Sequence, residues 1–144
     1  MTLWILDTDC VSLFQKSHPL LTQRINQVNP QELAVTVITV EEQMRGWLKV
    51  TRGKNAQEER LIWAYQGLRK TVEYFNQVNL LDFDRPALTQ YQELIQQRIR
   101  IGTQDLKIGA IALSRSAILV TRNHRDFEQI PGLQWEDWTT APEA

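Results

Sequence analysis

Short apolar runs that alternate with segments of helical period are the feature that most constrains the fold of this chain. Apolar runs of strand length lie at Leu3–Leu6, Leu33–Ile38, Val78–Leu81, Ala117–Val120 and Leu133–Trp135. Apolar residues at helical spacing predict helices over Thr8–Gln15, Pro19–Gln27, Val40–Val50, Gln57–Phe75, Arg85–Arg100, Asp105–Arg115 and, as a short turn, Asp126–Gln129. This β-α-β-α alternation predicts an α/β fold: a three-layer α/β/α sandwich with a mostly parallel sheet.

The size and composition of the chain fit one ordinary domain over residues 1–144. Of its 144 residues, 42% are apolar, which is enough for a sizeable core. The single cysteine, Cys10, excludes an internal disulfide and a cysteine-rich zinc site. No apolar run reaches the length of a membrane span, and we see no signal peptide. We therefore expect a cytoplasmic protein that makes no membrane contact.

Acidic and amide side chains follow three of the predicted strands at the point where each strand ends. Asp7 follows the first strand directly, and Glu41 and Glu42 come shortly after the second. Asn123 and Asp126 follow the fourth. Because the carboxyl ends of parallel strands share one edge of the sheet, where ligands bind in such folds, we expect these side chains to converge there.

Two further acids belong to the same region. Asp105 opens the helix that leads into the fourth strand, and Asp9 lies two residues beyond Asp7. Several carboxylates at one point repel one another, and a divalent cation relieves that repulsion. Mg²⁺ and Mn²⁺ prefer hard oxygen ligands, and such an ion can acidify a bound water and balance charge on a phosphodiester. The pattern therefore predicts a metal-dependent hydrolase.

Each acid taken singly also has a purely structural interpretation. Asp7 or Thr8 could cap the following helix, and Thr39-Val-Glu-Glu42 has the pattern of a capping box. Further structural roles of this kind are Thr103 as a cap with Asp105 in its first turn, and Asn123 as a cap with Asp126 three residues on. Caps need only a side-chain oxygen, so the repeated choice of acids favours a functional site.

Four segments, in this order and spacing, resemble the motifs of PIN-domain nucleases, and among them the VapC-like toxins of bacterial toxin–antitoxin pairs. The first is Leu6-Asp7-Thr8-Asp9, an apolar strand followed by an acid. The second runs from Thr36 to Gly46 and places a Glu four residues before the Gly. The third, Ile101–Ala110, has an Asp opening a helix of small residues, and the fourth is Val120–Phe127.

The resemblance implies an Mg²⁺- or Mn²⁺-dependent endoribonuclease that often acts on structured RNA such as tRNA. It also implies a homodimer and inhibition by a cognate antitoxin protein. Carried over by position, Asp7, Glu42 and Asp105 match the metal-binding acids of the family. Glu42, rather than Glu41, keeps the spacing to Gly46.

The fourth motif departs from the commoner family pattern. Many relatives carry Asp where this chain has Asn123, which offers an oxygen but no charge. Asp126 can compensate from three residues on, so we predict Asp7, Glu42, Asp105 and Asp126 as catalytic residues and Asn123 as a metal ligand beside the first three. Asp9, where Asn is frequent in the family, adds a charge to the site or serves as a turn residue.

Contacts with RNA must come from local clusters, because 16 basic and 17 acidic side chains leave a net charge of only −1. Arg45, Lys107, Arg122 and Arg125 flank the motif segments, where they could bind phosphates on either side of a scissile bond. Aromatic residues that could stack on bases are Trp47, Trp63, Trp135 and Trp138. With only His18 and His124 in the chain, we expect no histidine metal pair, and we expect His124 to be an exposed loop residue.

Two other functions remain open at this stage. Asp7-Thr8-Asp9 also fits the Asp-x-Asp start of haloacid-dehalogenase-type phosphatases, although no adjacent acid pair follows Val120. A non-catalytic RNA- or partner-binding domain on the same fold is the other, and the uncharged Asn123 is the feature that supports it. Apolar surfaces that an inhibitor protein could cover are expected around Met44, Trp47 and Leu48 and around Leu61 and Trp63.

Overall fold

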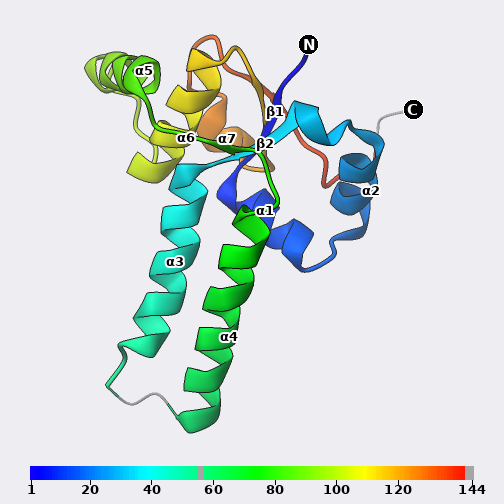
Figure 1. Ribbon diagram of the computed structural model, residues 1–144. Coiled ribbons are helices and arrows are strands. Elements are labelled where there is room, and N and C mark those ends of the chain that lie inside the picture. The colour runs from blue at the N-terminus through cyan, green and yellow to red at the C-terminus, as the bar shows by residue number, and fades with distance from the viewer. Residues whose placement is uncertain (55–56, 142–144) are drawn as a thin grey trace.

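The computed structural model describes residues 1–54 and 57–141 and contains one five-stranded sheet (Figure 1). The strands are β1 (Trp4–Leu6), β2 (Leu33–Thr36), β3 (Leu80–Leu81), β4 (Ile118–Val120) and β5 (Gln134–Glu136). The helices are α1 (Thr8–Gln15), α2 (Pro19–Gln27), η1 (Pro30–Glu32, a 3₁₀ turn), α3 (Val37–Thr51), α4 (Glu58–Phe75), α5 (Arg85–Gln96), α6 (Thr103–Ser114) and α7 (His124–Phe127). The sheet order is β3-β2-β1-β4-β5, and every neighbouring pair is parallel.

Alternate residues of the central strands point into two separate cores, one on each face of the sheet. Ile5 and Leu119 are fully buried in the core beneath α5 and α6. Leu6 and Val120, one residue further along each strand, pack with residues of α1 and α2 on the opposite face. This period of two is what a strand covered on both faces requires. The predicted three-layer α/β/α fold is therefore confirmed, and the sheet is wholly parallel.

Helices α3 and α4 form a long hairpin that projects away from the sheet (Figure 1). The indole of Trp47 on α3 lies across Gly67 on α4, and its Nε1 donates to the hydroxyl of Thr71 at 2.8 Å. Trp63 packs against Trp47 edge to face, with ring centroids 5.0 Å apart. Within the described part of the chain, no helix is both long and apolar enough to cross a membrane.

The second strand is shorter than predicted, because a helix begins within the predicted span Leu33–Ile38. The hydroxyl of Thr36 accepts the backbone N–H of Thr39 at 3.4 Å and caps α3, so the β-branched residues after Thr36 are helical. The capping box predicted for Thr39 and Glu42 is therefore wrong, since both lie inside the helix. Glu42 instead occupies the second turn of α3, close to the sheet edge.

Other element ends were also displaced for local reasons. The helix predicted to run to Arg100 ends at Gln96, because Arg98 adopts a left-handed backbone with φ of 59°. Helix α6 is capped by Gly102. Thr103 is therefore its first residue, and the prediction that Thr103 is the cap is wrong. The last short helix begins at His124, two residues before the predicted start. Helices α1 and α2 have the predicted bounds, and η1 was not predicted. The remaining elements lie where the pattern predicts them, with shifted ends.

Candidate active site

Asp7 lies at the carboxyl end of the central strand β1 and caps helix α1. Its carboxylate accepts the backbone N–H of Cys10 at 2.8 Å and the hydroxyl of Thr121, at the end of β4, at 2.6 Å. Only 3% of Asp7 is exposed. This burial raises the pKa of the carboxyl above 3.8, although both hydrogen bonds lower it. Asp7 is thus a cap and a buried acid at once, so its two interpretations are compatible.

Glu42 is held toward α1 by a hydroxyl. Its Oε1 accepts a hydrogen bond from Thr8 Oγ1 at 2.6 Å, and Thr8 Oγ1 also lies 2.9 Å from Thr39 Oγ1. Thr8 follows Asp7 in sequence, so this contact brings Glu42 to the same end of β1. The sequence indicated that Thr8 could cap a helix, but that role belongs to Asp7.

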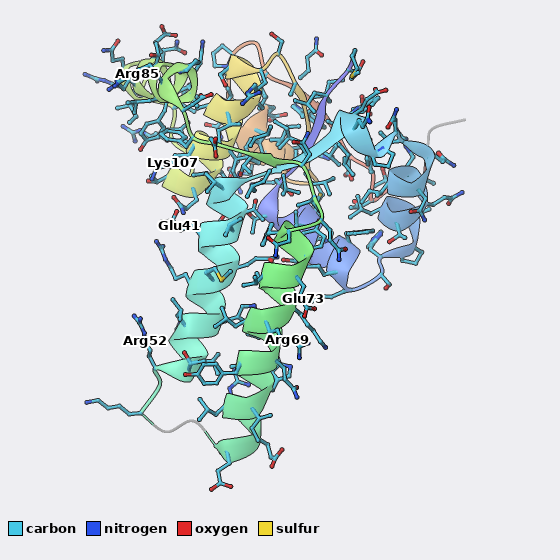
Figure 2. The ribbon with its side chains drawn as sticks, viewed as in Figure 1. Glu41, Arg52, Arg69, Glu73, Arg85 and Lys107 are labelled. Carbon is cyan, nitrogen blue, oxygen red and sulfur yellow. The ribbon has the colours of Figure 1, made fainter. Side chains whose placement is uncertain are left out.

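Glu41, the neighbouring acid, serves a different part of the structure. Its Oε1 accepts the side-chain amide of Gln104 on α6 at 2.6 Å, and its Oε2 lies 3.3 Å from Arg45. Figure 2 shows Glu41 on the side of α3 that faces α6. This arrangement supports the choice of Glu42 over Glu41 that the spacing to Gly46 indicated.

Asp105, in the first turn of α6, experiences the charges of the other acids. Its pKa is raised from 3.8 to about 6, first by burial and then by repulsion from Asp7, Glu42, Asp126 and Asp9, in that order. Electrostatic repulsion of this kind falls off quickly with distance in water. Carboxylates that follow β1 or lie on α1, α3 and α7 therefore all act on the charge at the start of α6.

Asn123 and Asp126 complete this group from α7. Asn123 Nδ2 donates to Asp126 Oδ2 at 3.0 Å, and the Asn123 backbone N–H donates to Thr121 Oγ1 at 3.0 Å. Asn123 occupies the cap position of α7, but its side chain accepts no backbone N–H, so the capping interpretation is wrong. Because Nδ2 faces Asp126, the amide oxygen of Asn123 is an uncharged oxygen that could bind a cation.

Asp9 stands at the exposed rim of the group and pairs with Arg122. Arg122 Nε donates to Asp9 Oδ2 at 2.6 Å, and the guanidinium makes a second contact of 3.3 Å to Oδ1. The hydrogen bond and the charge of Asp9 raise the pKa of Arg122. Asp9 thus both acts on Asp105 and holds an arginine beside the acids.

The other predicted RNA-binding residues differ in their surroundings. Arg125 is exposed on α7, next to Asp126. Lys107 on α6 lies with its ammonium 5.9 Å from the ring centre of Tyr91 (Figure 2). Arg45 is engaged with Glu41, further along α3.

The aromatic residues divide between core, hairpin and site. Trp138 is 1% exposed and belongs to the core. Trp135 stacks on His124, with ring centroids 4.5 Å apart and planes inclined by 20°. His124 begins α7, is only half-exposed, and has its Nε2 2.8 Å from Asp137 Oδ2, so the expectation of an exposed loop histidine is wrong. Burial acts to raise the pKa of Asp137, but hydrogen bonds from Thr139 and His124 lower it overall.

Asp137 was missed in the sequence, although a signal for it exists. It directly follows β5, as Asp7 directly follows β1, and β5 lies beside β4 at the edge of the sheet. The predicted last strand, Leu133–Trp135, ended one residue too early, which left Asp137 outside the strand-end pattern.

The donors at this edge suit a hard divalent cation that keeps part of its water shell. Carboxylate and amide oxygens are the ligands that Mg²⁺ and Mn²⁺ prefer. Among residues 1–54 and 57–141, no three Asp, Glu, His or Cys side chains are close enough to hold an ion between them. Mg²⁺ commonly binds through one or two carboxylates and several waters, so the residues fit a partly hydrated ion.

Known protein families and solved structures include close matches to this parallel α/β fold. The family model of the PIN domain matches residues 5–133. The chain therefore belongs to the PIN-domain family.

Relatives within this family match the chain over nearly its full length. Ribonuclease VapC1 of Haemophilus influenzae (strain R2866) is 33% identical over 141 residues, which cover 95% of this chain and 98% of the relative. The tRNA(fMet)-specific endonuclease VapC of Shigella flexneri is 28% identical over 143 residues, or 96% of this chain and 100% of the relative. The solved structure of VapBC-1 from nontypeable Haemophilus influenzae superposes with a TM-score of 0.77 and 29% identity, covering 96% of this chain and 100% of that one.

Proposed function

We propose that this chain is a metal-dependent endoribonuclease, the toxin of a toxin–antitoxin pair, and that it cleaves structured RNA such as tRNA. The relatives named ribonuclease VapC1 and tRNA(fMet)-specific endonuclease VapC support the activity and the substrate class. The observation that carries the proposed site is the cluster of acids whose hydrogen bonds hold Asp7 and Glu42 at the end of β1 and Asn123 beside Asp126, and the raised pKa of Asp105 agrees with it. Such a cluster is unfavourable by itself and becomes favourable around a cation.

Asp7, Glu42 and Asp105 would hold one Mg²⁺ or Mn²⁺, directly or through water, with Asn123 or Asp126 completing the shell. The ion supplies an acidified water and balances negative charge on the phosphodiester. Three of these side chains are already fixed by neighbouring groups. Thr121 and the Cys10 N–H hold Asp7, Thr8 holds Glu42, and Asp126 holds Asn123. Groups that hold ligands in this way fix the direction in which the ligands face a bound ion.

The residues around the acids would bind the RNA backbone. Arg122 reaches the rim of the site through Asp9, and the exposed Arg125 lies next to Asp126. Arginine side chains of this kind contact two oxygens of one phosphate. Since the overall net charge is −1, RNA must be drawn by these local cations and not by the charge of the whole molecule.

The partner in this proposal is a cognate antitoxin protein, and the similarity to VapBC-1 supports it. Helix α4 exposes several large apolar residues that a bound partner would cover. Their exposed fractions are 52% for Ile62, 49% for Trp63, 56% for Tyr65 and 47% for Val72. A homodimer and a cytoplasmic location also stay predictions. Co-purification with the product of the neighbouring gene tests the partner, and failure to form a stable complex would count against it.

Cleavage of cellular RNA by the purified chain, freed of any inhibitor, tests the activity. We expect cutting with Mg²⁺ or Mn²⁺, none with EDTA, and none by Asp7→Asn or Asp105→Asn. Glu32→Gln is the matched control, because Glu32 precedes β2 and so lies at the opposite edge of the sheet. Cutting that persists in both Asp variants would refute the site.

A folded wild type that binds Mn²⁺ but cuts no RNA would favour the non-catalytic binding domain instead. The uncharged Asn123 is the structural feature that such an outcome would point to. Membership of the PIN-domain family leaves the phosphatase alternative without support.

A further inference from the structure

The hydroxyl of Thr8 lies between two other side chains in a way that helix capping does not explain. Thr8 is the first residue of α1, and the capping oxygen of that helix comes from Asp7. Thr8 Oγ1 instead contacts α3 twice, at 2.6 Å from Glu42 Oε1 and 2.9 Å from Thr39 Oγ1. These contacts join residues 34 and 31 positions apart in the sequence.

The number of hydrogens available fixes the direction of these hydrogen bonds. A hydroxyl has one hydrogen to donate, and an ionised carboxylate can only accept. The hydrogen of Thr8 therefore goes to Glu42, and the second contact requires Thr39 to donate to Thr8. Thr39 is fully buried, so its hydroxyl has no competing access to solvent. The three groups form a directed series: Thr39 O–H to Thr8 Oγ1, and Thr8 O–H to Glu42 Oε1.

We propose that Thr8 is a positioning residue for Glu42, and that Thr39 orients the Thr8 hydroxyl. The series draws the Glu42 carboxylate toward Asp7 and uses one of its two oxygens, which leaves the other for a cation. A hydrogen bond to an ionised acceptor is stronger than one between two neutral groups. The hydroxyl of Thr39 strengthens the bond from Thr8 to Glu42 further by polarising the Thr8 hydroxyl. This inference rests on the proposed function, because it assigns Glu42 to the cation site.

Mn²⁺ binding to the purified chain, measured by calorimetry without RNA, tests the proposal. Groups that orient a metal ligand typically change metal affinity by about 10–100-fold when they are removed. We expect Thr8→Val to weaken Mn²⁺ binding by about tenfold or more, in that range. Thr8→Ser keeps the hydroxyl and should bind like the wild type. Thr39→Val leaves the Thr8 hydroxyl in place but free to rotate, so the loss of Mn²⁺ affinity should be smaller than in Thr8→Val.

Two controls separate positioning from a general structural effect. Thr51→Val removes a hydroxyl from the far end of α3, where Thr51 donates to the carbonyl of Leu48, and should leave Mn²⁺ affinity unchanged. In a double-mutant cycle, Thr8→Val should have little further effect once Glu42→Gln has removed the charge that Thr8 orients. Should Thr8→Val not fold, Thr8→Ala takes its place in the same series.

Wild-type affinity in Thr8→Val, equal losses in Thr8→Val and Thr8→Ser, or additive effects in the cycle would each overturn the inference. Failure of the proposed function would look different. A chain that binds Mn²⁺ with the expected dependence on Thr8 but cuts no RNA would refute the nuclease and leave the role of Thr8 standing. A wild type that binds no Mn²⁺ would overturn both.

Discussion

At the scale of one residue, the ionised Asp105 carboxyl lowers the stability of the folded chain. Its pKa is about 6 in the folded chain and 3.8 when unperturbed, so the folded state binds the proton more tightly. Stability therefore falls as pH rises from 3.8 to about 6, and the full penalty is present above the raised pKa. Below 3.8 the carboxyl is protonated in both states and makes no such contribution.

Replacing this acid should stabilise the metal-free chain while it abolishes activity. We expect Asp105→Asn to raise the metal-free Tm at neutral pH by several degrees, since about 1 kcal/mol shifts Tm by roughly 2–4 °C in a chain of this size. The gain should shrink as the pH falls toward 3.8, where the wild-type carboxyl is protonated too. Calorimetric scans of the wild type and Asp105→Asn in EDTA, from neutral pH down toward pH 3.8, check this difference in Tm. A gain that does not vary with pH would mean that repulsion is not its cause.

The pair of Asp9 and Arg122 leads to a second prediction at this scale. Arg122→Gln removes the cation that Asp9 holds beside the acids, so one phosphate contact is lost. The dependence of RNA affinity on salt should then become shallower by about 0.7–0.9 in log–log slope, the value for one phosphate contact. Stability should change by less than about 1 kcal/mol, because both side chains are half-exposed. Anisotropy of an uncleavable labelled RNA across KCl concentrations measures the slope, and an unchanged slope would show that Arg122 does not contact the RNA.

At the scale of elements, the sequence predicted the positions of the acids better than the contacts that orient them. Asp7 and Asn123 could be placed because parallel strands end at one edge, and that holds whichever residue ends the strand. The contact of Thr8 with Glu42 could not be predicted, because it joins residues 34 positions apart and depends on where α3 begins. That start was misplaced because Val37 and Ile38 favour strands, while the Thr36 cap makes them helical.

The α3–α4 hairpin offers a matched pair of glycine substitutions. An added Cβ at Gly67 would lie 2.4 Å from the Trp47 ring, which is held by Thr71 and Trp63. At Gly46, also within a helix, nothing lies within 4 Å. We expect Gly46→Ala to stabilise the chain by about 0.5–1 kcal/mol through helix propensity. Gly67→Ala should destabilise it by about 1 kcal/mol or more through overpacking.

Urea unfolding of both glycine variants checks this contrast. If Gly67→Ala were as stable as Gly46→Ala, the close packing of Trp47 on α4 would be wrong.

At the scale of the whole molecule, the hairpin and the sheet should differ in local stability. The two cores lie on the faces of the sheet, whereas the end of the hairpin projects from them and exposes Ile62 and Tyr65 (Figure 1). Segments with few buried apolar contacts open with less free energy than the core. We expect amides in residues 59–66 to exchange with solvent deuterium well before those of β1 and β4. Equal protection would mean that hairpin and sheet unfold as one unit.

The central claim is that acids from separate elements meet at the sheet edge to hold one cation. Anomalous diffraction from crystals soaked in Mn²⁺ tests it most directly, because the signal locates the ion itself. We expect a peak within direct coordinating distance of at least one carboxylate of Asp7, Glu42 or Asp105, near the roughly 2.0–2.1 Å that Mg²⁺ prefers. That peak should be lost in Asp105→Asn. A peak elsewhere on the chain, or one that survives this substitution, would contradict the account.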